Sequence, residues 1–167
     1  MANQDIPRGF KKVGGAALCP GFYDRDADGS TPIFPGDLVA FDNDGLINAA
    51  SAGDTALLGA ADDFATGSAA KTNIAVYDDP DEKFTAQDEA GATPTQTYVG
   101  LNADHLATAG SLLTKISAHE IDIDTASTAT FGLRLLDFIN RPDNTVGVNV
   151  EWVVRINEHA FATATGE

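Results

Sequence analysis

The residues whose types and spacing most resemble a site for chemistry are Asp24, Asp26 and Asp28, within residues 24–29. A calcium loop of the EF-hand type places oxygen ligands at its first, third and fifth positions and a glycine at its sixth. The run matches this opening, but Pro35 stands at the twelfth position, where a bidentate glutamate belongs. The sequence therefore leaves two interpretations open, a cation-binding loop or an acidic turn exposed to solvent.

The other acidic clusters and the histidines do not have the spacing of a metal site. Residues 42–44 and 78–81 are rich in Asp and Asn, which is typical of turns because these side chains hydrogen-bond the turn backbone. His119 adjoins Glu120 and His159 adjoins Glu158, but neighbouring residues on a strand face opposite ways. His105 is the third histidine and stands apart from both pairs. We therefore favour the acidic turn for residues 24–29 and expect neither a metal ion nor a cofactor.

The motifs of common enzyme classes are also missing from the sequence. It contains no Gly-x-Ser-x-Gly elbow and no phosphate-binding Gly-x-x-x-x-Gly-Lys loop. A glycosidase pair could lie among the many carboxylates, but spacing alone does not identify one. Cys19 is the only cysteine, so an intrachain disulfide is excluded and a buried or incidental thiol is expected. We predict that the chain is not an enzyme and has no catalytic residues.

The charge of the chain is strongly acidic and unevenly distributed. The formal net charge is −15, and a surface of this sign repels nucleic acid and anionic lipid. Arg8, Lys11 and Lys12 against Asp5 give residues 1–23 a net charge of +2, which leaves −17 on the remainder. A weakly basic arm on an acidic body suits an acidic neighbour, although three cations can equally have no role. No apolar run of about 18 residues and no secretory signal is present, so no membrane association is expected.

The elements that would position these residues divide into an arm and a body. Glycine and proline interrupt residues 1–30 too often for a helix or a long strand, yet the segment contains apolar residues such as Phe10 and Phe22. We predict an extended N-terminal arm that becomes ordered against its own body or a neighbouring subunit. Arg8, Phe10, Lys11 and Lys12 are its candidate contact residues. Residues 31–167 form the predicted body.

The pattern of the body predicts a series of short strands separated by turns. This pattern is typical of an all-β fold, and we expect a small antiparallel β-barrel or sandwich. A long hairpin is predicted over residues 128–159, with strands at 130–139 and 146–156. From Val146 to Ile156 every second residue is apolar, which is typical of a half-buried strand. Residues 102–116 have apolar residues at helical spacing around Gly110, so a short helix or an ordered loop is expected there. The remaining predicted strands cover residues 38–41, 46–48, 55–60, 73–77, 83–87, 97–101 and 119–123.

The aromatic residues of the C-terminal region allow a second functional hypothesis. Trp152, Phe131, Phe138 and Phe161 could form a platform for a glycan or another host-surface ligand. Aromatic side chains on an alternating strand more often belong to the core. The sequence favours core positions, and an exposed Trp152 would favour the binding module instead.

Several segments resemble small virion proteins of tailed bacteriophages that are taken to be capsid cement or decoration proteins. The closest similarity lies in Leu133-Arg134-Leu135, in Asn140-Arg141-Pro142-Asp143-Asn144 and in residues 152–159. Residues 5–11, 76–87 and 99–104 resemble the same family, whereas residues 33–60 match its pattern less clearly.

The resemblance implies a structural protein on the capsid exterior that has no catalytic residues. It implies that the major capsid protein is the partner, that the chain forms a homo-oligomer, most commonly a trimer, and that the arms reach neighbours. Assembly would take place in the bacterial cytoplasm, where a single free Cys19 is unremarkable. Adhesion to the capsid would then be the whole mechanism, because it bridges capsomers and so stabilises the head.

Overall fold

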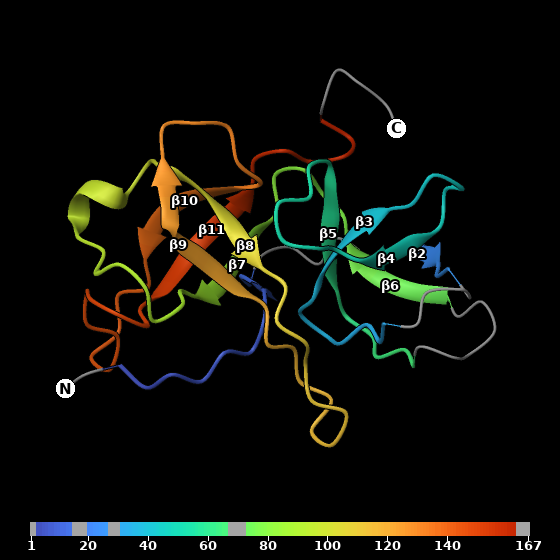
Figure 1. Ribbon diagram of the computed structural model, residues 1–167, viewed down its shortest axis with the longest axis horizontal. Coiled ribbons are helices and arrows are strands. Elements are labelled where there is room, and N and C mark those ends of the chain that lie inside the picture. Colours follow the sequence, from blue (N-terminus) through green and yellow to red (C-terminus); the bar gives the residue numbers. More distant parts are fainter. Residues whose placement is uncertain (1–2, 15–19, 27–30, 67–72, 163–167) are drawn as a thin grey trace.

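The computed structural model of the protein describes residues 3–14, 20–26, 31–66 and 73–162. Within this part of the chain there is no α-helix, and the only helical segment is the short 3-10 turn η1 at Gln96–Tyr98. All strand pairs in the two sheets are antiparallel, and one hydrophobic core joins the sheets (Figure 1). The prediction of an all-β antiparallel fold is confirmed, and the architecture is the sandwich.

The larger sheet has six strands in the order β1-β7-β11-β10-β8-β9. It combines an N-terminal strand with strands from the second half of the chain, so the pairs β1–β7 and β7–β11 join residues far apart in sequence. Its strands are β1 (Lys11–Lys12), β7 (Lys83–Gln87), β8 (Asn102–Leu106), β9 (Glu120–Ser127), β10 (Leu133–Phe138) and β11 (Glu151–Ile156).

The smaller sheet has five strands in the order β2-β6-β5-β3-β4 and is drawn on the right of Figure 1. Its strands are β2 (Gly21–Asp24), β3 (Leu38–Phe41), β4 (Ile47–Ala49), β5 (Leu57–Ala61) and β6 (Asn73–Tyr77). The segment predicted to be an arm therefore contributes a strand to each sheet. β1 pairs with β7 and β2 pairs with β6.

Two hydrophobic clusters explain why the smaller sheet is buried on both faces. On β3, Leu38 and Ala40 belong to the main core, whereas Val39 between them belongs to a second cluster. This alternation follows from the period of two in a strand, which sends neighbouring side chains to opposite faces. All five residues of β5 are buried, as expected for a strand covered on both sides.

The main core is built around Trp152. Its side chain is fully buried and packs on Phe138, with ring centroids 4.0 Å apart. Val150, Val154 and Ile156 are also buried on the same row of residues. The alternating apolar residues predicted from Val146 to Ile156 therefore belong to the core from Val150 onward.

The predicted strand at 146–156 is wrong in its first half, since β11 begins only at Glu151. Gly147 has a φ of 153° and Asn149 a φ of 58°, so the backbone there departs from an extended strand. Val146 is 47 % exposed, although it fits the apolar alternation. The hairpin of β10 and β11 is present, with a shorter ladder and an irregularity between Leu135 and Asp137.

Two other predicted elements are also corrected. Residues 97–101 form no strand, because a 3-10 turn ends there before β8 begins. Residues 102–106 form strand β8 rather than a helix, and the loop alternative holds for residues 107–119. The strands predicted at 38–41, 73–77 and 83–87 match β3, β6 and β7 at both ends.

Nowhere in the described residues is there a helix that is long and apolar enough to cross a membrane.

Candidate interaction surface

The N-terminal segment lies along the chain's own body. The Phe10 N–H donates to the Gly36 carbonyl at 2.8 Å, and the Val13 N–H donates to the Lys83 carbonyl at 2.8 Å. Before these contacts, the Gln87 side chain accepts a hydrogen bond from the Ile6 N–H at 2.9 Å. Residues 3–13 therefore contact the chain's own body, and contact of this segment with a neighbouring subunit stays a prediction.

Phe10 is the anchor of this segment. Its side chain is 2 % exposed and belongs to the main core. Gly9, just before it, has a φ of +69°, and a Cβ there would lie 2.5 Å from both the Gly36 carbonyl oxygen and the Ser117 hydroxyl oxygen. A residue with a side chain is strained in this conformation, and this position also lacks the space for one. Gly9 therefore allows Phe10 to reach the core.

The three cations of the segment differ in their surroundings. Lys12 forms an ion pair with Glu82 at 2.8 Å, and its ammonium lies 5.0 Å from the centre of the Tyr77 ring. The hydrogen bond to Glu82 raises the pKa of Lys12. Arg8 and Lys11 are exposed. Of the candidate contact residues, Arg8 and Lys11 face solvent, Lys12 pairs within the chain, and Phe10 is internal.

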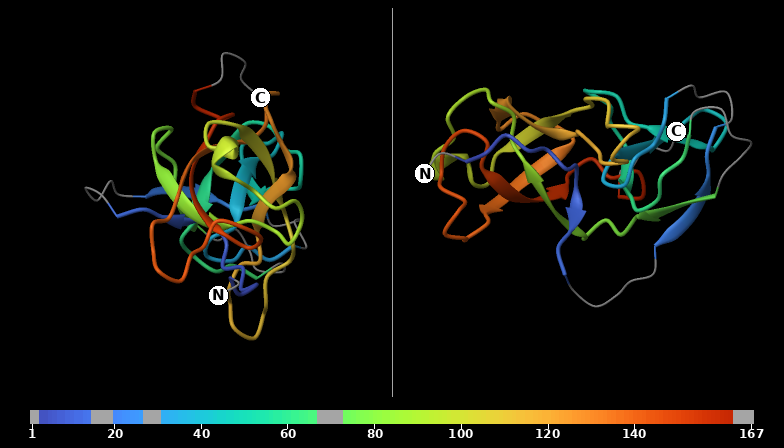
Figure 2. Two further views of the ribbon diagram at one scale, coloured as in Figure 1. Left: turned by 90° about the vertical axis from the view of Figure 1, so that its left-hand side faces the viewer. Right: turned by 90° about the horizontal axis from the view of Figure 1, so that it is seen from below.

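The connection between β8 and β9 projects from the body, below the two sheets in Figure 1 and again in the left view of Figure 2. Its tip is closed by a hydrogen bond in which the Ser111 N–H donates to the Ile116 carbonyl at 3.0 Å. At this tip Leu112 is 64 % exposed and Leu113 is 93 % exposed. Such exposure of adjacent leucines is costly unless another surface covers them.

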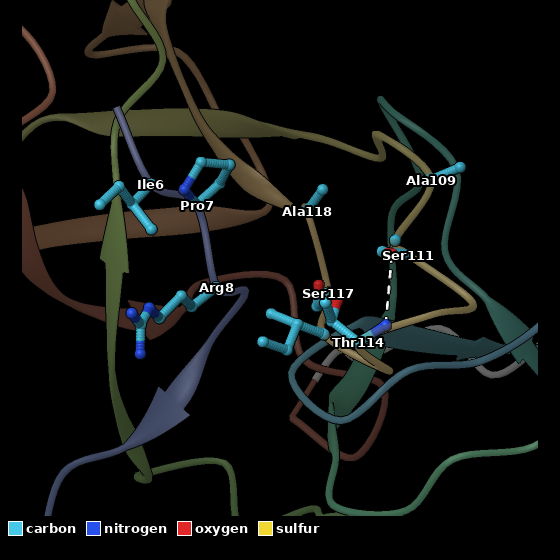
Figure 3. Close-up of a pocket in the computed structure, with 10 residues that line it drawn as sticks. Ile6, Pro7, Arg8, Ala109, Ser111, Thr114, Ser117 and Ala118 are labelled. Atoms are coloured by element: carbon cyan, nitrogen blue, oxygen red, sulfur yellow. Dashed lines mark hydrogen bonds between the residues drawn. The ribbon is translucent and has the colours of Figure 1, made fainter. Parts of the chain in front are cut away.

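A shallow hollow of about 290 Å³ lies between this loop and the N-terminal segment. Figure 3 shows Ile6, Pro7 and Arg8 on one side of the hollow and residues of the loop on the other. Its lining is mostly apolar, with Ile6, Pro7, Ala109, Ile116 and Ala118 contributing. We call the hollow and residues 107–118 together the loop surface.

The loop surface gathers much of the exposed apolar material of the protein. Seven large hydrophobic residues are strongly exposed in the described part of the chain, and Ile6, Leu112, Leu113 and Ile116 all belong to this surface. The sequence did not reveal this surface, because the helical spacing of the leucines left both a short helix and an ordered loop open. The signal available in the sequence was the adjacent pair Leu112-Leu113, two residues after Gly110. In the structure a Cβ on Gly110 would lie only 2.6 Å from the Phe34 ring, so this position has no space for a side chain.

A second hollow, also of about 290 Å³, lies behind the loop and contains the buried side chains of Asp37 and His119. The His119 Nδ1 accepts a hydrogen bond from the Leu38 N–H at 3.2 Å, so this nitrogen is not free to act as a base. Burial and the neighbouring His105 lower the pKa of His119 to about 3, and burial raises the pKa of Asp37 to about 6. The His119 Nε2 lies 3.6 Å from Asp37 Oδ1, too far for a hydrogen bond. This pair positions β3 and offers no catalytic dyad.

A third group of titratable residues consists of Asp88, Glu89 and Glu120, whose pKa values are raised by burial. The indole N–H of Trp152 donates to the buried Asp88 carboxyl group at 3.1 Å. Burial raises the pKa of Asp88 to about 7. Burial also raises the pKa of Glu89 and of Glu120 to about 7, with nearby carboxylates adding to both effects. These groups make the stability of the fold sensitive to pH.

The remaining predicted sites are placed as follows. Asp24 and Asp26 are described, but Asp28 lies outside the described residues, as does Cys19. Within the described ranges, no group of three or more His, Cys, Asp or Glu residues could hold a metal ion. The prediction of core positions holds for Trp152, whereas Phe131 and Phe138 are half-buried and Phe161 is 55 % exposed. The aromatic residues therefore form no common exposed platform around Trp152.

Comparison of the chain with protein-family models, with curated proteins and with solved structures found no match.

Proposed function

We propose that the chain is a virion structural protein of the cement or decoration type. It binds the outer surface of a major capsid protein lattice and stabilises the head by bridging neighbouring capsomers. Its mechanism is adhesion through surface area, and it assembles in the bacterial cytoplasm as part of the virion.

The observation that supports this proposal is the convergence of the segments that resemble the cement proteins. These segments are scattered from residue 5 to residue 159, yet five of the six strands of the larger sheet overlap them. β1, β7, β11, β10 and β8 are consecutive in the sheet, and only the edge strand β9 has no counterpart. Apart from Val76 and Tyr77, which lie in β6 of the smaller sheet, the resembling strand residues all belong to one continuous sheet. This concentration favours a shared structural unit over scattered chance matches.

The motif at residues 140–144 has a structural task that explains why its residue types matter. The Asn144 amide donates to the carbonyls of Ile139 and Glu151, both at 2.9 Å, and accepts from the Glu151 N–H at 2.8 Å. Arg141 forms ion pairs with Asp143 at 2.5 Å and with Glu151 at 3.0 Å. The motif therefore closes the hairpin and fixes where β11 begins.

The alternative function, recognition of a glycan or a host surface, has less support. It depends on an aromatic ring with an open face, and Trp152, the residue named for it, is fully buried. The exposed apolar residues lie instead on the loop surface, which has no exposed aromatic residue among those lining the hollow. We therefore retain adhesion to a capsid as the proposal.

The test uses the full chain and heads purified from the phage whose genome encodes it, after bound accessory proteins have been removed. Heads and increasing amounts of the chain are sedimented together, and the bound chain is quantified. We expect the chain to bind saturably, at a fixed ratio to the major capsid protein. Heads saturated with the chain should also break open at a higher temperature than heads without it. Absence of saturable binding would overturn the proposal, and an unrelated protein of similar net charge controls for trapping.

A further inference from the structure

We propose that the loop surface is a contact between two copies of this chain, in which the Leu112-Leu113 tip of one copy enters the hollow of another. The inference does not depend on capsid binding, because self-association is measured with the purified chain alone. Its failure would leave the proposed function standing.

The first argument is shape. The loop surface carries a projecting apolar tip beside an apolar hollow, within a single continuous region. Leu113 is 93 % exposed, whereas Ile116, on the same loop, both lines the hollow and is 41 % exposed. A surface that holds a projection and a matching depression side by side can pair with its own copy, which is how a symmetric interface is built.

The second argument is charge. The chain has a formal net charge of −15, so two copies repel one another over most orientations. From His105 to His119 there is no Asp or Glu, and no carboxylate lines the hollow. The only ionised side chains there are Arg8 and Lys115, and the Lys115 ammonium is held 4.8 Å from the centre of the Phe64 ring. An acidic chain can approach its copy at this acid-free region with the least repulsion.

The third argument is order. Two hydrogen bonds hold the loop in a fixed form: the Ser111 N–H donates to the Ile116 carbonyl at 3.0 Å, and the Lys115 N–H donates to the Ser111 carbonyl at 2.7 Å. On the opposite side of the hollow, Gly9 and the buried Phe10 hold the N-terminal segment in place. Both walls of the hollow are thus preorganised, so association costs little ordering of either wall.

The test is sedimentation velocity of the full chain over a concentration series, together with the double variant Leu112→Ser, Leu113→Ser. We expect the natural chain to self-associate and the double variant to lose at least about tenfold in association constant for each leucine, because burying a leucine contributes more than that increment. Raising the salt concentration should strengthen association of the natural chain, since it screens the repulsion between acidic copies.

Two further variants separate the contact from a folding defect. Val146→Ser removes another exposed apolar residue, away from the loop surface, and should associate like the natural chain. Ala118→Trp leaves the leucines intact but fills the hollow, and should weaken association as the double variant does. Thermal unfolding of each variant confirms that it is folded. A natural chain that stays monomeric, or a folded double variant that associates as strongly as the natural chain, would overturn the proposal.

Discussion

Replacing Phe10 with alanine should destabilise the isolated chain strongly. The side chain is 2 % exposed in the main core, and removal of a buried phenylalanine costs about 3 to 5 kcal/mol. That is a large share of the roughly 5 to 15 kcal/mol by which domains are usually stable. The N-terminal segment would then act as part of the fold rather than as a free arm.

The measurement is urea unfolding followed by the fluorescence of Trp152, in the Leu112→Ser, Leu113→Ser background so that association does not contribute. Phe22→Ala is the matched control, since Phe22 also belongs to the N-terminal region but is 65 % exposed, and it should change stability by less than about 0.5 kcal/mol. The reasoning is refuted if Phe10→Ala costs less than about 1 kcal/mol. It is also refuted if the loss depends on protein concentration, because Phe10 would then pack into another copy.

Three other predictions concern the same core. The Asp88→Asn variant keeps an acceptor for the Trp152 indole. As the pH rises from 4 to 8, its free energy of unfolding should increase relative to that of the natural chain, by up to about 4 kcal/mol. The sign follows because Asp88 in the folded chain has a pKa raised to about 7, whereas in the unfolded chain its pKa is the ordinary 3.8. Between these values the natural chain must take up a proton to fold, and the variant does not. A stability difference that stays constant across this pH range in urea unfolding would contradict the prediction. Gly9→Ala should lower stability by about 1 to 3 kcal/mol because of its positive φ and the close Gly36 and Ser117 atoms. Gly14→Ala, with open space around it, should be nearly neutral in the same unfolding assay, and equal effects would argue against the strained turn. Acrylamide should quench Trp152 fluorescence weakly, and strong quenching would reopen the aromatic platform.

The fold was largely predictable where the hydrophobic pattern and the turns agreed. Strands β3 and β6 are short apolar runs, and β7 alternates polar residues with Phe84 and Ala86. An Asp directly follows each of the three, and their limits were found. The pattern failed at Val146 and Val148, where apolar alternation continues but the positive φ of Asn149 ends the strand. Backbone conformation at a single asparagine is set by the turn that surrounds it, and hydrophobic periodicity carries no information about it.

The candidate surface was harder to predict, because it depends on contacts between distant residues. Phe10 was recognised as an apolar residue that needs a partner, but its place in the core depends on Gly36, 26 residues further along the chain. The apolar spacing of Leu112, Leu113 and Ile116 suits either a short helix or an ordered loop, and the structure has the loop. The chain turns between Gly110 and Lys115, whose φ is 55°, and so leaves these side chains exposed. Apolar residues are usually expected in the core, and an exposed apolar patch such as the loop surface departs from this expectation.

The most direct test of the central claim is a reconstruction by electron cryomicroscopy of heads saturated with the chain, compared with heads that lack it. The account predicts added density on the outer surface at repeating lattice positions, shaped like the two-sheet body and in contact with at least two neighbouring capsomers. Added density that lies only inside the shell or at the tail, or no added density at saturation, would contradict it.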